Sequence, residues 1–272
     1  EKQNVDVAVI EVGLGGRLDS TNIITPEVSV ITNIGIDHTQ FLGNTLEAIA
    51  VEKAGIIKPH IPVVIGETQK ETTSVFLNIA KQNEAGIYFA DTLIAEAFPS
   101  DLKGSYQTKN IKTVIQTCHV LKNTFPVTEA QIKRGLLQVV KNTHLQGRWQ
   151  VLQEQPKVIC DTAHNKEGLT YVVKQLQEET FKTLHIVFGV VNDKDLSSFL
   201  GVLPKKAIYY FCKPDVPRGM SEIFLKNEFI SFGYKGESYL SVNEALKAAK
   251  LNASASDLIY VGGSTFVVSE II

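Results

Sequence analysis

The stretch that decides the fold class is Val5-Asp6-Val7-Ala8-Val9-Ile10-Glu11-Val12-Gly13-Leu14-Gly15-Gly16-Arg17. Its apolar beginning, Val5 to Ile10, has the β-branched bias of a buried parallel strand. Glu11 follows this run directly, and the glycines after it permit close approach of the backbone. A carboxylate at the carboxyl end of a parallel strand lies in the crevice where α/β proteins bind ligands. The stretch therefore predicts an α/β protein. Its glycines match no phosphate-binding pattern, so the stretch alone favours a flexible strand-to-loop turn over a ligand site.

The rest of the first half alternates between strand-like and helix-like segments, as α/β proteins do. Apolar runs with β-branched residues predict strands, and stretches with helix start and stop signals predict helices. A helix near Asn110 has apolar residues on one face, and Thr128 with Gln131 forms the capping box of the next helix. The expected strands are 5–10, 28–34, 62–65 and 87–90, and the other expected helices are 46–54 and 71–84.

A domain boundary is expected near His144 to Gly147, after which strands and helices alternate again. The sequence thus predicts two α/β domains, residues 1–146 and residues 147–272, the second being doubly wound and Rossmann-like. Ser241 with Glu244 forms a capping box in the second domain. The expected strands there are 157–160, 184–188, 207–211 and 258–261, and the expected helices begin near Lys166, Asp195, Ser221 and Ser241.

The composition excludes several classes of protein. With 27 basic and 29 acidic residues in 272 and a formal net charge of -2, we expect neither a nucleic-acid partner nor a membrane partner. No apolar stretch approaches the about 20 residues that a membrane helix needs, and no secretion signal is visible. The three cysteines lie apart in apolar runs without a C-x-x-C pair, which predicts buried, reduced thiols in a cytoplasmic protein.

Polar residues follow two of the predicted strands at what we expect to be one edge of the first sheet. Glu11 follows strand 5–10, and His38 follows strand 28–34 within Gly35-Ile36-Asp37-His38-Thr39, so both side chains are placed to converge on one ligand. A lone histidine after a strand is more often simply hydrogen-bonded, and Mg²⁺ prefers oxygen donors. Lys53, late in helix 46–54, is in isolation a solvated cation that opposes the helix dipole. The residues alone leave these alternatives open.

Three ordered motifs favour the functional interpretation when they are taken together. They are Glu11-Val12-Gly13-Leu14-Gly15-Gly16-Arg17-Leu18-Asp19, Ile34-Gly35-Ile36-Asp37-His38-Thr39 and Glu52-Lys53-Ala54-Gly55-Ile56-Ile57-Lys58-Pro59. They closely resemble the folylpolyglutamate synthase and dihydrofolate synthase family of Mur-type ligases. The resemblance extends through Gly147-Arg148-Trp149 and Asp161-Thr162-Ala163-His164-Asn165 to Gly262-Gly263-Ser264, and so covers essentially the whole chain.

The resemblance implies a site that binds ATP, Mg²⁺, L-glutamate and a folate or dihydropteroate. Glu11 and His38 are the implied Mg²⁺ ligands, and Lys53 is implied to be a catalytic residue whose carbamylated side chain helps to organise the metal site. His164, implied to be catalytic, and Ser264 are placed near the incoming glutamate. The implied pterin contacts are Leu18, Asp19 and Ser20, and the implied ATP contacts are Asn110, Arg148 and Asp161.

Most of these implied roles have a purely structural alternative. Asn110 is also a suitable first-turn helix residue, Asp161 with His164 also suits a hydrogen-bonded turn at a strand end, and Ser264 also suits a helix cap. Arg148 is the stronger candidate, because a fixed guanidinium suits phosphate and developing negative charge.

The reaction implied by the resemblance is ATP-dependent amide formation. A substrate carboxylate attacks the γ-phosphate of ATP, and the amino group of glutamate then displaces phosphate from the acyl phosphate. Members of this family begin with a Gly-rich phosphate loop that ends in Gly-Lys-Ser or Gly-Lys-Thr, and no Gly-Lys pair occurs in this chain. We therefore expect an N-terminally truncated chain that is inactive alone, in which residues 1–146 are the remainder of a Mur-ligase-like P-loop ATPase domain.

Some functional questions stay open at this stage. The intact enzyme is expected to be a monomer, and whether it acts as dihydrofolate synthase, folylpolyglutamate synthase or both is undecided. The alternatives are another Mur-type amide ligase and a non-catalytic ligand-binding module.

Overall fold

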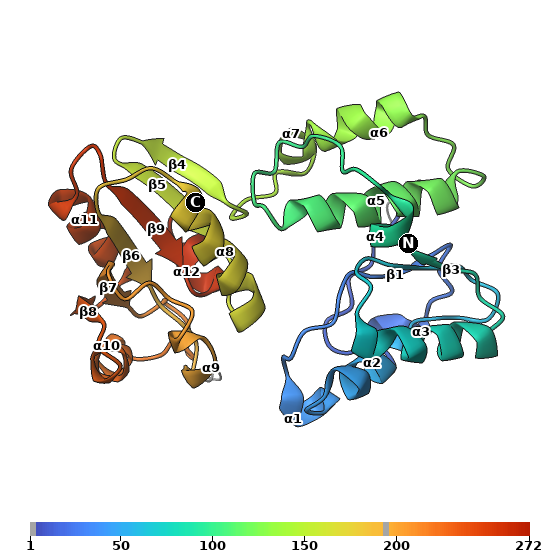
Figure 1. Cartoon of the computed structure of the whole chain (residues 1–272), viewed down its shortest axis with the longest axis horizontal. Coiled ribbons are helices and arrows are strands. Elements are labelled where there is room, and N and C mark those ends of the chain that lie inside the picture. The colour runs from blue at the N-terminus through green and yellow to red at the C-terminus, as the bar shows by residue number, and fades with distance from the viewer. Residues whose placement is uncertain (1–3, 193–195) are drawn as a thin grey trace. The chain divides into compact units, whose positions relative to one another are not determined.

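The computed structural model describes residues 4–192 and 196–272, which form two compact units (Figure 1). The first unit consists of Glu1–Pro99 with Thr108–Leu136, and the second consists of Ser100–Gln107 with Leu137–Ile272. The segment 100–107 therefore belongs to the second unit, although first-unit residues precede and follow it in the chain. The division after Leu136 precedes the boundary expected near His144 to Gly147.

The first unit is an α/β structure with a short parallel sheet. Its described residues form one three-stranded sheet in the order β1-β2-β3, with β1 Ser29–Ile31, β2 Val63–Ile65 and β3 Ile87–Phe89. Ile49, Phe76 and Ala80 are buried against these strands in one apolar cluster. The other elements are η1 Ser20–Ile23, α1 Thr39–Leu42, α2 Leu46–Ala54, α3 Lys70–Gln82, α4 Ala90–Leu93, α5 Gln107–Leu121 and α6 Glu129–Leu136.

Local signals in the sequence located several of these elements. Helix α2 has the predicted bounds, and the side chain of its N-cap Thr45 accepts a hydrogen bond from the backbone N–H of Ala48. The capping box before α6 is confirmed, because the side-chain oxygens of Thr128 and Gln131 accept hydrogen bonds from each other's backbone N–H groups at 3.3 and 2.8 Å.

The prediction of a buried strand over residues 5–10 is wrong. This run is not a strand, and Val9 is 94% exposed. A strand is stabilised by ladder hydrogen bonds to a neighbour. In the described sheet β1 is an edge strand that pairs with β2 alone, so no described strand pairs with residues 5–10. The inference that Glu11 directly follows a sheet strand falls with this strand.

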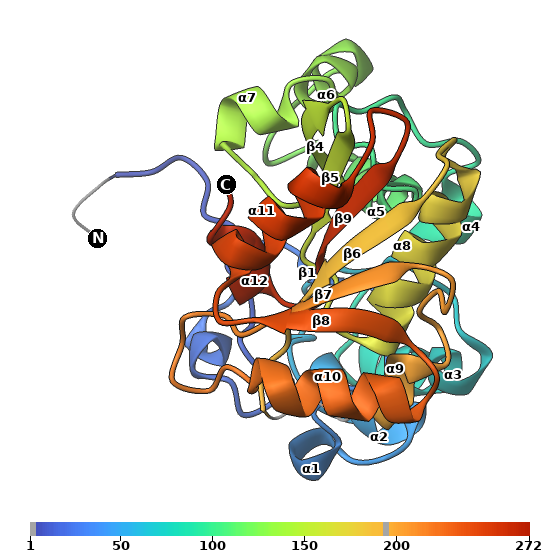
Figure 2. The ribbon, with the colours of Figure 1, turned by 90° about the vertical axis from the view of Figure 1, so that its left-hand side faces the viewer.

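The second unit is a doubly wound α/β domain. Its described residues form one six-stranded sheet in the order β4-β5-β9-β6-β7-β8, and every pair is parallel except β4 with β5. Figure 2 shows this order, and Figure 1 shows α8 and α11 on opposite sides of the sheet. The strands are β4 Gln150–Glu154, β5 Lys157–Asp161, β6 Leu184–Phe188, β7 Ile208–Cys212, β8 Lys235–Tyr239 and β9 Leu258–Gly262. The helices are α7 Val139–Thr143, α8 Lys166–Glu178, α9 Ser197–Leu200, α10 Glu222–Ser231, α11 Val242–Asn252 and α12 Thr265–Ser269.

Two apolar clusters fill the two faces of this sheet. Helices α8, α9 and α10 share one cluster with alternate residues of the central strands, and Phe229 of α10 lies there between Phe188, Tyr209 and Phe211. Helices α11 and α12 share the other cluster. Because both faces are covered, the central strands are apolar on both sides, which is the pattern from which they were predicted.

The four predicted strands of this domain are confirmed, but β4 and β8 were not predicted. Both are edge strands, and their sequences are Gln150-Val151-Leu152-Gln153-Glu154 and Lys235-Gly236-Glu237-Ser238-Tyr239. Polar residues suit a partly solvated edge and weaken the strand signal. The helix start expected near Asp195 lies outside the described residues.

The described residues also allow a statement on membrane-spanning helices and on the cysteines. The described helices include none that is both long and apolar enough to cross a membrane. All three cysteines are free thiols; Cys160 and Cys212 are buried as expected, whereas Cys118 is only half-buried.

Candidate functional site

In the second unit, the carboxyl ends of β5, β9 and β6 lie side by side. Asp161, the last residue of β5, pairs with Gly262 of β9, which also pairs with Phe188 of β6. Strand β9 lies between β5 and β6, although β5 and β6 are consecutive in the chain and are connected through α8. Helix α8, which follows β5, packs on one face of the sheet, and α12, which follows β9, packs on the other. Such a switch point is where doubly wound sheets open a ligand-binding crevice. Three of the predicted site residues, Asp161, His164 and Ser264, come from these strand ends.

The Asp161 carboxylate is the centre of a hydrogen-bond network at this edge. It is 2% exposed, its Oδ2 accepts hydrogen bonds from the Tyr106 hydroxyl and the Trp149 backbone N–H, both at 2.7 Å, and its Oδ1 accepts from the Ala163 N–H at 2.8 Å. Burial raises the pKa of Asp161, although these hydrogen bonds and the charge of Arg148 oppose the rise. Asp161 is therefore a buried acceptor that joins three segments of the chain.

Arg148 lies in a tight turn that is fixed to the end of β5. The backbone N–H of Thr162 donates to the carbonyl of Gly147 at 3.0 Å, and the Arg148 guanidinium donates to the hydroxyl of Thr162. Gly147 and Trp149 have left-handed φ angles of 71° and 47°, and a Cβ on Gly147 would lie 2.9 Å from the Thr162 side chain. The turn thus places a half-buried cation beside the strand ends.

His164 and Ser264 differ in their accessibility. The His164 side chain is exposed, and its Nδ1 lies 3.1 Å from the carbonyl oxygen of Thr162. Ser264 is 3% exposed, and its Oγ caps α12 by accepting a hydrogen bond from the Phe266 N–H at 3.2 Å. The capping alternative for Ser264 is therefore what the structure shows, and its contact with glutamate stays a prediction.

In the first unit, Asp19 organises the Gly-rich loop. Its Oδ2 accepts hydrogen bonds from the backbone N–H groups of Gly13 at 3.0 Å and Leu14 at 2.9 Å. Its Oδ1 accepts from the Thr21 hydroxyl at 2.6 Å and the Thr21 N–H at 2.9 Å. These hydrogen bonds lower the pKa of Asp19 to about 2, and the bond from the Thr21 hydroxyl has the largest effect. The neighbouring predicted pterin contacts are exposed, Leu18 by 81% and Ser20 as well.

The same loop is fixed to the carboxyl end of α2, the helix that contains Lys53. The Arg17 N–H donates to the carbonyl of Glu52 at 2.8 Å, and the Arg17 guanidinium pairs with the Glu52 carboxylate at 3.0 Å. A Cβ on Gly16 would lie 2.8 Å from the carbonyl oxygens of Glu52 and Lys53. Glycine is required here because the two backbones touch.

The structure does not gather the predicted metal and phosphate residues of the first unit into a closed site. Glu11 and His38 are exposed, and their side chains make no hydrogen bond or ion pair with another described residue. Lys53 is half-buried and likewise unpaired within the described part of the chain. Asn110 is exposed in the first turn of α5. No cluster of three or more His, Cys, Asp or Glu side chains that could hold a metal occurs among the described residues.

Tyr106 and Thr162 were not predicted as site residues, although both contact the predicted ones. Thr162 lies within the quoted Asp161–Asn165 motif, so the motif itself was a usable signal. Tyr106 had no comparable local signal, because it contacts a residue that lies 55 positions further along the chain.

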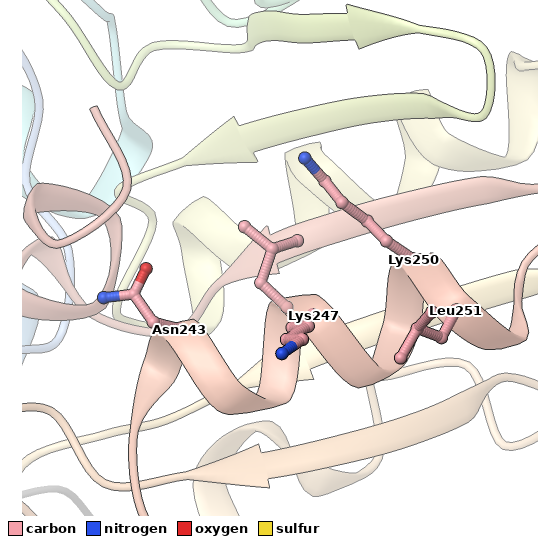
Figure 3. A pocket seen from close by; sticks show the side chains of 5 residues that line it. Asn243, Lys247, Lys250 and Leu251 are labelled. Carbon is pink, nitrogen blue, oxygen red and sulfur yellow. The ribbon is translucent and has the colours of Figure 1, made fainter.

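A surface hollow of about 340 Å³ lies away from these residues, on α11 (Figure 3). Asn243, Leu246, Lys247, Lys250 and Leu251 line it. The ammonium groups of Lys247 and Lys250 do not converge on one point (Figure 3). None of the predicted site residues lines the hollow, so it does not identify the site.

Comparison with known proteins identifies this arrangement. Residues 1–137 match the Mur ligase middle domain, and residues 147–265 match the Mur ligase glutamate ligase domain. The fold is thus that of the middle and glutamate-ligase domains of Mur-type ligases, while the roles of Arg148 and Asp161 stay predictions. The chain is 32% identical to the folylpolyglutamate synthase of Lacticaseibacillus casei, across 99% of this chain and 67% of that protein. The chain belongs to the folylpolyglutamate synthase/dihydrofolate synthase family.

Two further comparisons agree with this assignment. The chain is 31% identical to a probable bifunctional folylpolyglutamate synthase/dihydropteroate synthase of Haloferax volcanii, across 99% of this chain and 34% of that protein. It also superposes with a TM-score of 0.81 and 29% identity on the Yersinia pestis folylpolyglutamate synthase/dihydrofolate synthase complexed with AMPPNP and Mn ion, covering 96% of this chain and 64% of that one. The chain therefore spans about a third of the length of the Haloferax volcanii protein and less than two thirds of the Yersinia pestis chain.

Proposed function

We propose that the protein ligates L-glutamate to the carboxylate of a folate or dihydropteroate at the expense of ATP, through an acyl phosphate. The observation that carries the proposal is the carboxyl edge of the second unit, where the turn with Arg148 is fixed to Asp161, which pairs with Gly262 at the end of β9. Residues 147–272 would form the glutamate-ligase domain and residues 1–146 would contribute the ATPase part. The likeness to synthases along both units supports this division.

Arg148 is the residue best placed to hold phosphate. Its guanidinium uses one nitrogen for Gly147 and Thr162, which leaves other donors of the planar group for phosphate oxygens. Because the turn is fixed, the charge needs little reorganisation when negative charge develops during phosphoryl transfer. Asp161 fixes the same turn by accepting the hydrogen bond of the Trp149 N–H. Asn110, at the start of α5, would contact ATP with its polar side chain.

Glu11 and His38 would hold a magnesium ion that is shared with nucleotide. Both side chains are exposed and unpaired among the described residues, so their donor atoms are available. Two protein ligands leave the other octahedral positions to water and phosphate oxygens, which is how proteins usually bind Mg²⁺. Such an ion would neutralise phosphate charge during the transfer. A carbamate on Lys53, which has no partner among the described residues, would add a further oxygen anion in the same unit.

The organic substrates are assigned to the exposed residues Leu18, Ser20 and His164 and to the buried Ser264. Leu18 and Ser20 extend from the loop that Asp19 holds, and they would contact the pterin. The exposed His164, fixed by the carbonyl of Thr162, and the strand-end Ser264 would face the incoming glutamate. We also propose that the enzyme acts as a monomer. We further propose that it works in the cytoplasm, where free cysteines such as these stay reduced.

The test is ADP release by the whole protein that carries these residues, measured with and without each substrate. Release that requires both L-glutamate and a pteroate or folate acceptor, with the amide product seen by mass spectrometry, is the expected result. Binding of nucleotide and acceptor without turnover would instead indicate a ligand-binding module. Turnover with a peptidoglycan-type acceptor alone would place the protein with another Mur-type ligase.

A further inference from the structure

A segment outside the glutamate-ligase match contacts the site of the second unit. Residues 100–107 precede Thr108 of the first unit, yet they pack on α7 and α8 of the second. The Ser105 N–H donates to Oε1 of Gln175 at 2.7 Å, and Nε2 of Gln175 donates to the carbonyl of Lys103 at 2.9 Å. Asp101 accepts a hydrogen bond from the Val140 N–H at 3.0 Å. The segment is therefore held along its length and not only at Tyr106.

Tyr106 is oriented on this segment by two contacts. Its ring meets the ring of Tyr171 in α8 edge-on, with centroids 6.5 Å apart, and its hydroxyl donates to Oδ2 of Asp161 at 2.7 Å. Burial, followed by the charge of Asp161, raises the pKa of Tyr106, so the hydroxyl stays a donor across the ordinary pH range.

The oxygen that Tyr106 contacts is also the one that holds the turn before β4. Oδ2 of Asp161 accepts the Trp149 N–H as well, while Oδ1 accepts the Ala163 N–H. If the Tyr106 hydroxyl were absent, the carboxylate would lose one of the donors that fix its rotation and stabilise its charge. The neighbouring N–H of Trp149, next to Arg148, is therefore coupled to Tyr106 through a single atom.

We propose that Tyr106 is a positioning residue of this site, whose hydroxyl holds the Asp161 carboxylate against the Trp149 N–H and thereby fixes the turn that presents Arg148. Its consequence for catalysis rests on the proposed ligase function, whereas the positioning itself does not. Tyr106 lies outside the 147–265 match, so the ligase domain takes a residue of its site from the segment that leads into α5.

Other ionisable groups also lie near Asp161 in the structure or in the chain. Arg148 approaches from the turn before β4, Cys160 precedes Asp161 in β5, and Tyr260 in β9 donates to the backbone carbonyl of Asp161 at 3.3 Å. His164 follows on the exposed side. Burial raises the pKa of Cys160 to about 12, and that of Tyr260 is raised well above its usual range, so neither titrates together with a carboxylate.

The protein contains its own reporter for a test. Trp149 is the single tryptophan of the chain and is 4% exposed. Its fluorescence should be followed against pH in the unmodified chain and in Tyr106→Phe, which keeps the ring against Tyr171. Loss of a hydrogen bond to a charged acceptor should raise the midpoint of the acid transition by about one pH unit. Asp161→Asn should abolish the transition, and Tyr239→Phe, a hydroxyl deletion elsewhere in the unit, should leave it unchanged.

Circular dichroism confirms that each variant is folded before the titration is interpreted. An unchanged midpoint in Tyr106→Phe, or a transition that persists in Asp161→Asn, would overturn the proposal. Because this readout needs no substrate, its failure is distinct from failure of the ligase assignment. In the whole protein, Tyr106→Phe should lower kcat about tenfold with an acid limb shifted in the same direction. A loss of activity without that shift would mean a merely structural role.

Discussion

Replacement of Asp161 by alanine tests whether this buried carboxylate holds the second unit together. The substitution removes the acceptor of the Trp149 and Ala163 N–H groups and of the Tyr106 hydroxyl. Each buried donor left without a partner costs about 1–3 kcal/mol, so the two backbone groups together cost about 2–6 kcal/mol. Release of a buried charge offsets part of this cost, because burial raises the pKa of Asp161. We expect a net loss of about 3 kcal/mol, which is a large share of the 5–15 kcal/mol typical of a domain.

Urea unfolding followed by Trp149 fluorescence measures this loss in the unit that contains Asp161. The midpoint should fall while the slope stays constant, which separates a change in stability from a change in the unfolded state. Asp161→Asn keeps one acceptor oxygen and should lose about half as much. Asp215→Ala is the matched control, because the exposed Asp215 side chain makes no hydrogen bond to a described residue, and it should change stability by less than about 0.5 kcal/mol. A midpoint for Asp161→Ala equal to that of Asp215→Ala would refute the reasoning.

Four further predictions concern the metal residues, the Gly-rich loop and a buried histidine. Glu11→Ala or His38→Ala should each sharply reduce ATP-dependent activity of the whole protein without loss of fold; unchanged activity at saturating Mg²⁺ would contradict metal ligation. Lys53→Ala should lose activity that small carboxylic acids partly restore, whereas a fully active Lys53→Arg would exclude the carbamate. Asp19→Asn should speed amide hydrogen exchange in the Gly-rich loop; in the unmodified chain, whose Asp19 pKa is about 2, the loop order should persist well below pH 3.8. His185 is 1% exposed, and burial lowers its pKa below 6.5, so on acidification the unfolded chain binds the proton before the folded chain does. Stability should therefore fall as the pH drops below about 6.5. Urea titrations should show a smaller fall in His185→Gln, and an unchanged dependence of stability on pH would contradict this prediction.

The sequence predicted those elements whose signals are local. The strand at Leu184–Phe188 is buried along its whole length and apolar apart from His185, so its pattern reflects its environment directly. The run 5–10 has an equally apolar pattern, but a strand also needs a partner backbone, and no pattern within six residues contains that information. The opposite error occurs for polar edge strands such as β8, which the sequence did not predict. Pairing with a neighbouring strand stabilises such a segment, although its side chains do not show the apolar pattern of a strand.

The candidate site shows the same division between local and long-range information. Arg148, Asp161 and His164 could be proposed from the sequence because each belongs to a short motif that resembles the family's, and their roles stay predictions. Tyr106 was not, since its role depends on a contact across 55 positions that only the folded chain creates. The sequence predicted both a helix cap and a ligand contact for Ser264 without deciding between them, because the same residue type suits both roles, and the structure shows the cap.

The geometry distinguishes the residues that can touch a ligand from those that act through others. Asp161 is 2% exposed and both of its oxygens already accept protein hydrogen bonds, so a direct bond to ATP would have to use the lone pairs that remain. Arg148 is half-buried with several guanidinium donors free of Thr162, and His164 is exposed. A charge held in a fixed turn contributes more to phosphate recognition than one that must first be ordered, because the entropy of ordering has already been lost on folding. We therefore expect Asp161 to act mainly as the hydrogen-bond acceptor that fixes the turn, and we expect Arg148 and His164 to be the side chains at this edge that contact a substrate.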